Sequence, residues 1–139
     1  MSSGAGSTVE LQAQMSNVSA ARRFVRTELE GRVPEEAVSD LMLATSELVT
    51  NAFEHGSPEP VRLTVRSNRG EASITVVSGG EASRVPDVDR WTTARVDRVS
   101  GRGLGIVREI ADDIDVERSA GTLAITVHRR FAPAEPSTR

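Results

Sequence analysis

Two polar residues of a predicted helix have the chemistry of a magnesium-dependent site. Glu47 and Asn51 are four residues apart, so on a helix they lie one turn apart, at the edge of the apolar stripe. In a cleft, the Glu47 carboxylate can act as a general base and the Asn51 amide oxygen can be a ligand of Mg²⁺. Spacing alone favours a solvated polar face, because Glu is a good helix former. His55 lies closer to the apolar stripe, which is typical of a core or helix-end histidine.

A glycine-rich segment offers a second chemistry, the binding of phosphate. Gly101, Gly103 and Gly105 alternate with Arg102 and Leu104 at the predicted start of a later helix. Backbone N–H groups there can approach an anion without obstruction by Cβ, and the helix N-terminus adds partial positive charge. The spacing matches neither the dinucleotide-binding fingerprint nor a Walker A sequence. A structural turn and a phosphate cradle therefore fit the segment equally well.

The elements that must position these residues form an α/β pattern. Helical periods and two-residue alternation follow one another with the helices grouped apart from hairpin strands. This order predicts a two-layer sandwich, a mixed and mostly antiparallel sheet with helices on one face. The expected elements are a strand near 9–13, helices over 18–29 and 34–55, strands over 61–66 and 72–77, a helix through 104–114, and strands near 116 and over 123–127. Residues 79–101 show no period, which is typical of a lid or binding loop.

Length and composition predict one globular domain and exclude several classes of partner. The 139 residues suit a single domain over 8–131, with flexible tails over 1–7 and 132–139. Only 3% of the residues are aromatic, so the core must be aliphatic. A net charge of −3 argues against direct nucleic-acid binding, and no apolar run is long enough to span a membrane. Without cysteine there is no thiolate nucleophile, and the absence of a secretory signal predicts a cytoplasmic protein.

Two motifs together resemble a known ATPase superfamily. Residues 46–56, Ser-Glu-Leu-Val-Thr-Asn-Ala-Phe-Glu-His-Gly, and residues 101–107, Gly-Arg-Gly-Leu-Gly-Ile-Val, resemble the N-box and the second glycine box of the gyrase, histidine-kinase and MutL ATPases. Within that superfamily the chain is similar to the anti-sigma-factor serine kinases, which are small bacterial partner-switching regulators. Residues 21–26 also resemble the first helix of the actinobacterial members. The resemblance covers 9–131 and implies the histidine-kinase-like ATPase fold.

The resemblance implies ATP and Mg²⁺ as cofactors and assigns roles to individual residues. Glu47 would be the general base and Asn51 the Mg²⁺ ligand. The phosphates would contact Gly103, Leu104 and Gly105, and Thr122 would assist adenine recognition through water. The candidate nucleotide site is completed by His55, Ser78, Gly80 and Gly101.

The resemblance also implies a protein partner. The first helix of the family contributes an arginine to the docking of a sigma factor or its antagonist protein, and Arg22 is the best match. Arg26 lies one turn later on the same face, whereas Arg23 is rotated off it. An exposed arginine pair fits a solvated surface as well as a docking site for a carboxylate. A homodimer is also compatible with the sequence.

One departure from the family leaves two functions compatible with the sequence. Where the family has an Asp that accepts the adenine amine, the chain has Ser78; Gly80 is kept, and Ala82 replaces a second glycine. A neutral hydroxyl makes a weaker hydrogen bond than a carboxylate, so we expect reduced nucleotide affinity. The sequence is then compatible with a kinase that phosphorylates a serine of the antagonist while sequestering a sigma factor, and with a non-catalytic adaptor of the same fold. In an unrelated α/β domain the same motifs would be structural.

Overall fold

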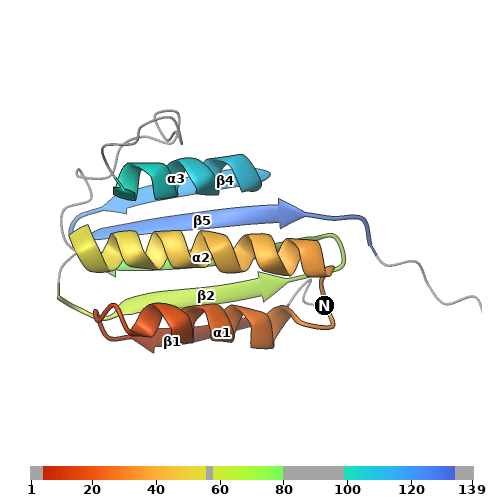
Figure 1. Cartoon of the computed structure of the whole chain (residues 1–139), viewed down its shortest axis with the longest axis horizontal. Helices are drawn as coiled ribbons and strands as arrows, with labels where there is room; N and C mark the ends of the chain where they lie inside the picture. The colour runs from red at the N-terminus through yellow and green to blue at the C-terminus, as the bar shows by residue number, and fades with distance from the viewer. Residues whose placement is uncertain (1–4, 56–57, 80–98, 134–139) are drawn as a thin grey trace, which may run out of the picture.

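The fold is an antiparallel sheet covered on one face by helices (Figure 1). The computed structural model describes residues 5–55, 58–79 and 99–133. Five strands lie in the order β1-β2-β3-β5-β4. The strands are β1 (Ala5–Leu11), β2 (Val61–Ser67), β3 (Glu71–Gly79), β4 (Asp113–Ser119) and β5 (Thr122–Arg130), and the helices are α1 (Asn17–Leu29), α2 (Glu35–His55) and α3 (Val99–Ile110). The predicted two-layer α/β sandwich is confirmed, although every pair among the described strands is antiparallel.

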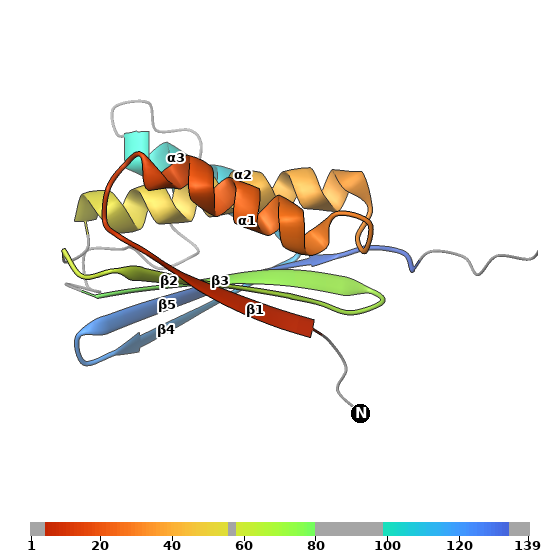
Figure 2. The same ribbon diagram turned by 90° about the horizontal axis from the view of Figure 1, so that it is seen from below.

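The hydrophobic core lies between the helices and the sheet. Figure 2 shows α1, α2 and α3 on one side of the sheet, with the opposite face left open. Helix α2 contacts both other helices and strands β2, β3 and β5. The buried hydrophobic side chains are all Ala, Val, Leu or Ile, as the low aromatic content predicts. None of the helices in the described ranges combines the length and the apolar character of a membrane-crossing segment.

Local sequence signals explain where several elements stop. Gly31 follows α1 with a φ of 85° and Gly121 joins β4 to β5 with a φ of 79°, a backbone region that glycine adopts without steric cost. Between β2 and β3, the Asn68 side chain accepts hydrogen bonds from the N–H groups of Gly70 at 3.0 Å and Glu71 at 2.9 Å. This side-chain turn confirms the predicted hairpin.

Three predicted boundaries are wrong. Strand β1 begins at Ala5, so residues 5–7 belong to the sheet and not to a flexible tail; their small side chains give no alternation, but they pair with β2. Helix α3 ends at Ile110, because the chain joins β5 through a hydrogen bond from Asp112 N–H to the His128 carbonyl, and Ile114 lies in β4. Helix α3 also begins at Val99, so the glycine segment lies inside the helix. The predicted loop over 79–101 falls mostly on residues 80–98, outside the described part of the chain.

Candidate functional site

Most of the predicted site residues gather at one end of the sandwich. The C-terminal end of α2, the end of β3, the start of β5 and the start of α3 lie at the same end in Figure 1. Strand pairing agrees with this, since Gly79 at the end of β3 lies opposite Thr122 at the start of β5. Helices α2 and α3 pack against one another. The fold therefore brings the two motifs together.

One contact between the motifs joins Glu47 of α2 to Gly103 of α3. A Cβ atom built on Gly103 would lie 3.1 Å from Glu47 Cδ and would overlap the Oε1 atom. Real Cβ atoms do not approach oxygen so closely, so any larger residue at this position would push the carboxylate away. Glycine at position 103 thus allows α3 to lie directly against the proposed base.

The environment of Glu47 changes its acidity. Burial raises the pKa of its carboxyl group, and the negative charge of Glu54 raises it further. A raised pKa brings the carboxylate closer to the proton affinity that a general base needs near neutral pH. The direction of this shift is compatible with the predicted role of Glu47 as a general base.

Asn51 and His55 follow Glu47 on α2 in different settings. Asn51 is only 7% exposed, so its carboxamide is held at the edge of the core. His55 lies at the exposed end of the helix, where its Nε2 atom is 3.8 Å from Glu54 Oε1. The structure places His55 as a helix-end histidine, which was one of the expectations from its position.

The start of α3 presents backbone N–H groups in a different register from the one predicted. The described part of α3 begins at Val99, where the described residues resume, so Gly101 lies in its first described turn. The N–H groups of Gly103, Leu104 and Gly105 are used in the helix itself, and the Leu104 side chain is part of the core. Of the predicted phosphate contacts, only Gly101 lies in the first described turn of α3.

Ser78 and Thr122 lie near each other on adjacent strands. Ser78 alternates with the core residues Ile74 and Val76, so its hydroxyl is on the helix-covered face, and the residue is 7% exposed. It pairs with Leu123, one residue from the exposed Thr122. Gly80, the next predicted contact, lies outside the described residues.

The two arginines of α1 that were predicted to dock a partner have different surroundings. Arg22 is exposed. Arg26 is engaged within the chain: its guanidinium donates to both Glu35 oxygens, at 3.0 and 2.7 Å, and lies 3.6 Å from Glu30. Hydrogen bonding to Glu35 raises the pKa of Arg26 despite some desolvation. This pair was not predicted from the sequence, because the partners are nine residues apart across the turn between the helices.

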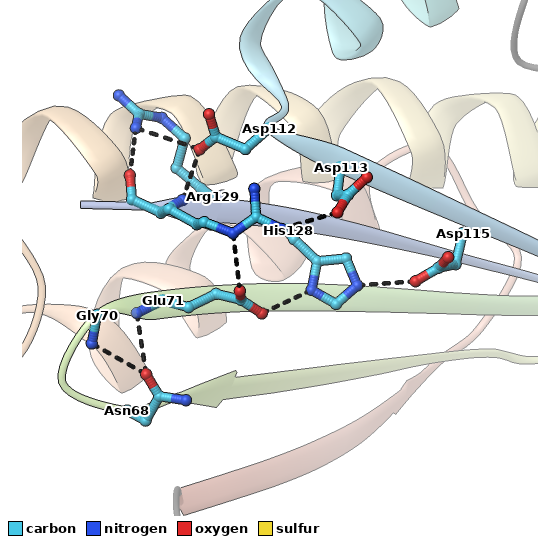
Figure 3. Close-up of polar contacts among 9 residues, drawn as sticks. Asn68, Gly70, Glu71, Asp112, Asp113, Asp115, His128 and Arg129 are labelled. Carbon is cyan, nitrogen blue, oxygen red and sulfur yellow. Dashed lines mark hydrogen bonds and ion pairs between the residues drawn. The ribbon is translucent and has the colours of Figure 1, made fainter.

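A second polar cluster, which sequence analysis missed, lies on the open face of the sheet (Figure 3). His128 Nδ1 is 2.8 Å from Glu71 Oε2, and His128 Nε2 is 2.9 Å from Asp115 Oδ2. Burial by itself lowers the pKa of His128, but the hydrogen bonds to the two carboxylates outweigh it and the net pKa is raised. The described residues contain no group of three or more His, Asp or Glu side chains that could hold a metal ion.

Comparison with known proteins gives a family and several solved structures, two of which are described below. Residues 11–129 match the model of the histidine kinase-like ATPase domain, whereas no curated protein matches the chain. The crystal structure of the RsbU and RsbW domains of Rv1364c from Mycobacterium tuberculosis is 20% identical with a TM-score of 0.67, over 96% of this chain and 35% of that one. The histidine kinase domain of the blue-light activated histidine kinase EL346 from Erythrobacter litoralis is 17% identical with a TM-score of 0.48, over 85% of this chain and 60% of that one.

Proposed function

The chain belongs to the histidine kinase-like ATPase domain family, and we propose that it is a partner-switching regulator that binds ATP with Mg²⁺, phosphorylates a serine of an antagonist protein and sequesters a sigma factor. The observation that carries the proposal is the contact between Glu47 and Gly103. It joins the two segments of the sequence that resemble the N-box and the second glycine box. The matched crystal structure spans about three times the length of this chain, so the activity and partners of this protein are our inference.

The described residues fit a magnesium nucleotide at one half of the site. Asn51 would supply an amide oxygen to Mg²⁺, and backbone N–H groups at the described start of α3 would hold phosphate oxygens. When bound, ATP would supply the phosphoryl group and Mg²⁺ would neutralise its charge. At the adenine half, the buried Ser78 hydroxyl stands in place of a carboxylate, so we expect the hydrogen bond there to be weaker.

Glu47 would act as the general base of the phosphate transfer. Its carboxylate would accept the proton of the serine hydroxyl as that oxygen attacks, and the raised pKa would favour this transfer. Contact with Gly103 would limit the positions open to the carboxylate. Arg22, exposed on α1, would contribute to docking of the protein partner through a carboxylate.

The test compares Glu47→Gln with Glu54→Gln, because Glu54 is an exposed carboxylate two turns further along the same helix. Each variant is incubated with γ-labelled ATP, Mg²⁺ and the candidate antagonist proteins. Glu47→Gln should bind nucleotide but transfer phosphate at least about 100-fold more slowly, the lower range for loss of a general base. Glu54→Gln should keep most of the transfer, because burial, the larger cause of the raised pKa of Glu47, remains. Normal transfer by Glu47→Gln would show that the base is another residue.

One observation favours a second candidate function, a non-catalytic adaptor of the same fold. Ser78 lacks the charge expected for adenine recognition and is buried on the helix-covered face. Because a ligand that binds only the folded state raises its melting temperature, MgATP separates the two functions. A rise in melting temperature supports the nucleotide-binding regulator. No rise at millimolar MgATP, together with retained binding of a protein partner, supports the adaptor.

A further inference from the structure

A pocket of about 420 Å³ lies at the end of the sandwich opposite to the candidate nucleotide site. It is formed where the turn between α1 and α2, the turn between β2 and β3, and the end of β5 meet, and these segments lie together at one end in Figure 1. Its volume falls in the range of roughly 300–1,000 Å³ that is usual for ligand sites. The lining residues are Gly31, Arg32, Val33, Pro34, Arg69 and Phe131.

Hydrogen bonds fix the walls of this pocket. The N–H groups of Arg32 and Val33 both donate to the Leu29 carbonyl, at 2.9 and 3.1 Å. On the other side, the Phe131 N–H donates to the Gly70 carbonyl at 3.0 Å. The Asn68 side chain fixes the turn that carries Arg69. The pocket is therefore formed before any ligand binds, which lowers the ordering cost of binding.

The side chains of the two pocket arginines lack partners among the described residues. Several carboxylates of α2, β3 and β4, and of the segment between α3 and β4, are paired with other basic side chains, namely Arg26, His128, Arg129 or Arg130. The pairs are Glu35 with Arg26, Asp40 and Asp112 with Arg129, Asp113 with Arg130, and Glu71 and Asp115 with His128. Within 5–55, 58–79 and 99–133, the side chain of neither Arg32 nor Arg69 has a hydrogen bond or ion pair. The pocket is thus a positive site on a protein whose net charge is −3.

The residues that line the pocket indicate the chemistry of a ligand that would fit it. A guanidinium binds a carboxylate through two parallel hydrogen bonds, and both arginines are exposed and accessible. The remaining wall is apolar, with Val33 buried, Phe131 half-buried and Pro34 exposed. A suitable ligand therefore carries a carboxylate and, close to it, an apolar side chain.

We propose that this pocket is a docking site for an acidic segment of a partner protein, whose carboxylate binds Arg32 and Arg69 and whose neighbouring apolar side chain packs on Val33 and Phe131. The opening between two surface turns suits a peptide segment, because protein surfaces reach exposed turns without rearrangement. A partner docked here leaves the opposite end of the sandwich accessible. The proposal requires no nucleotide, so it can fail or succeed independently of the proposed kinase function.

The experiment uses the full chain, labelled for two-dimensional amide NMR, and three probes. The first is the capped peptide acetyl-Leu-Asp-Leu-Glu-amide, the second is its neutral counterpart acetyl-Leu-Asn-Leu-Gln-amide, and the third is sodium acetate. The acidic peptide should shift the amide signals of Arg32, Val33 and Gly70 in a saturable way. The neutral peptide should bind at least about tenfold more weakly, since hydrogen bonds to charged groups contribute that much or more.

Variants complete the test. Arg32→Ala and Arg69→Ala should each weaken binding of the acidic peptide about fivefold or more, as expected for anchor residues. The matched control is Arg66→Ala, which removes an exposed arginine of β2 outside the pocket and should leave binding unchanged. Circular dichroism checks that each variant is folded. The proposal would be overturned if the two peptides bound equally well, or if Arg66→Ala weakened binding of the acidic peptide as much as the pocket variants do. It would also be overturned if acetate caused the same amide shifts as the acidic peptide at the same concentration.

Discussion

Replacement of Gly103 by Ala tests the contact on which the candidate site rests. In the interior of a helix, Ala is more favourable than Gly by about 0.8–1.0 kcal/mol. Here the new Cβ would overlap the Glu47 carboxylate, and pushing that side chain off its rotamer costs about 0.5–1.5 kcal/mol. The two effects oppose each other, so the stability of Gly103→Ala should stay close to that of the wild type.

A double-mutant cycle separates these two effects. When Glu47→Ala has removed the obstructing carboxylate, Gly103→Ala should stabilise the protein by the full helix gain of about 1 kcal/mol. The difference between the two backgrounds, measured by urea unfolding, should therefore be about 0.5–1.5 kcal/mol. A parallel cycle with Glu54→Ala, which removes an exposed carboxylate of the same helix, should be additive.

The reasoning fails if Gly103→Ala has the same effect in both backgrounds. A coupling energy below about 0.3 kcal/mol between the two substitutions would mean that the side chain of Glu47 does not lie against Gly103 in solution. Phosphate transfer provides a second readout. Because the displaced carboxylate can no longer accept the serine proton, Gly103→Ala should lose transfer while remaining folded.

Three further predictions concern the adenine end, the open face and α1. Ser78→Asp should tighten ATP binding by about 1.5–3 kcal/mol yet lower the melting temperature without nucleotide, because the new carboxylate is buried; calorimetry without a gain in affinity would contradict this. The raised pKa of His128 means that its stabilising charge is present below the ordinary value of 6.5 and is lost as the pH rises through the raised value. Urea unfolding of His128→Gln should therefore lack the loss of stability that the wild type shows over that range, and equal pH profiles would refute it. Arg22→Ala should change stability by less than about 0.5 kcal/mol but weaken binding of the cognate partner by at least about 1 kcal/mol, whereas the control Arg23→Ala should not; equal effects in a titration would leave Arg22 as ordinary surface.

The sequence predicted the elements well because their signals are local. Helix α2 has an apolar stripe, acidic residues in its first turn and a prolyl start, and it matches its predicted range closely. Prediction failed where the helical and the strand pattern overlap. Ile114 continues the helical spacing of α3 but also alternates with Val116 as in a strand, and hydrogen bonds to β5 place it in β4. Strand β1 starts early because its partner β2, far along the chain, provides the pairing.

The candidate site was predictable only in part for the same reason. The spacing of Glu47 and Asn51 is fixed by one helix and could be read directly. The contact between Glu47 and Gly103 depends on how two helices pack, for which a single sequence carries no signal. The pair of Arg26 and Glu35 and the cluster around His128 likewise join residues from different elements.

The most direct test of the proposed function is titration calorimetry of MgATP into the wild-type protein and into Asn51→Ala. Asn51 is buried at the edge of the core beside the proposed base, and it is the residue to which we assign Mg²⁺. The wild type should show saturable binding that disappears when Mg²⁺ is chelated, and Asn51→Ala should lose that magnesium-dependent part while keeping the wild-type fold. Equal binding by both proteins, or no binding by the wild type, would contradict the account.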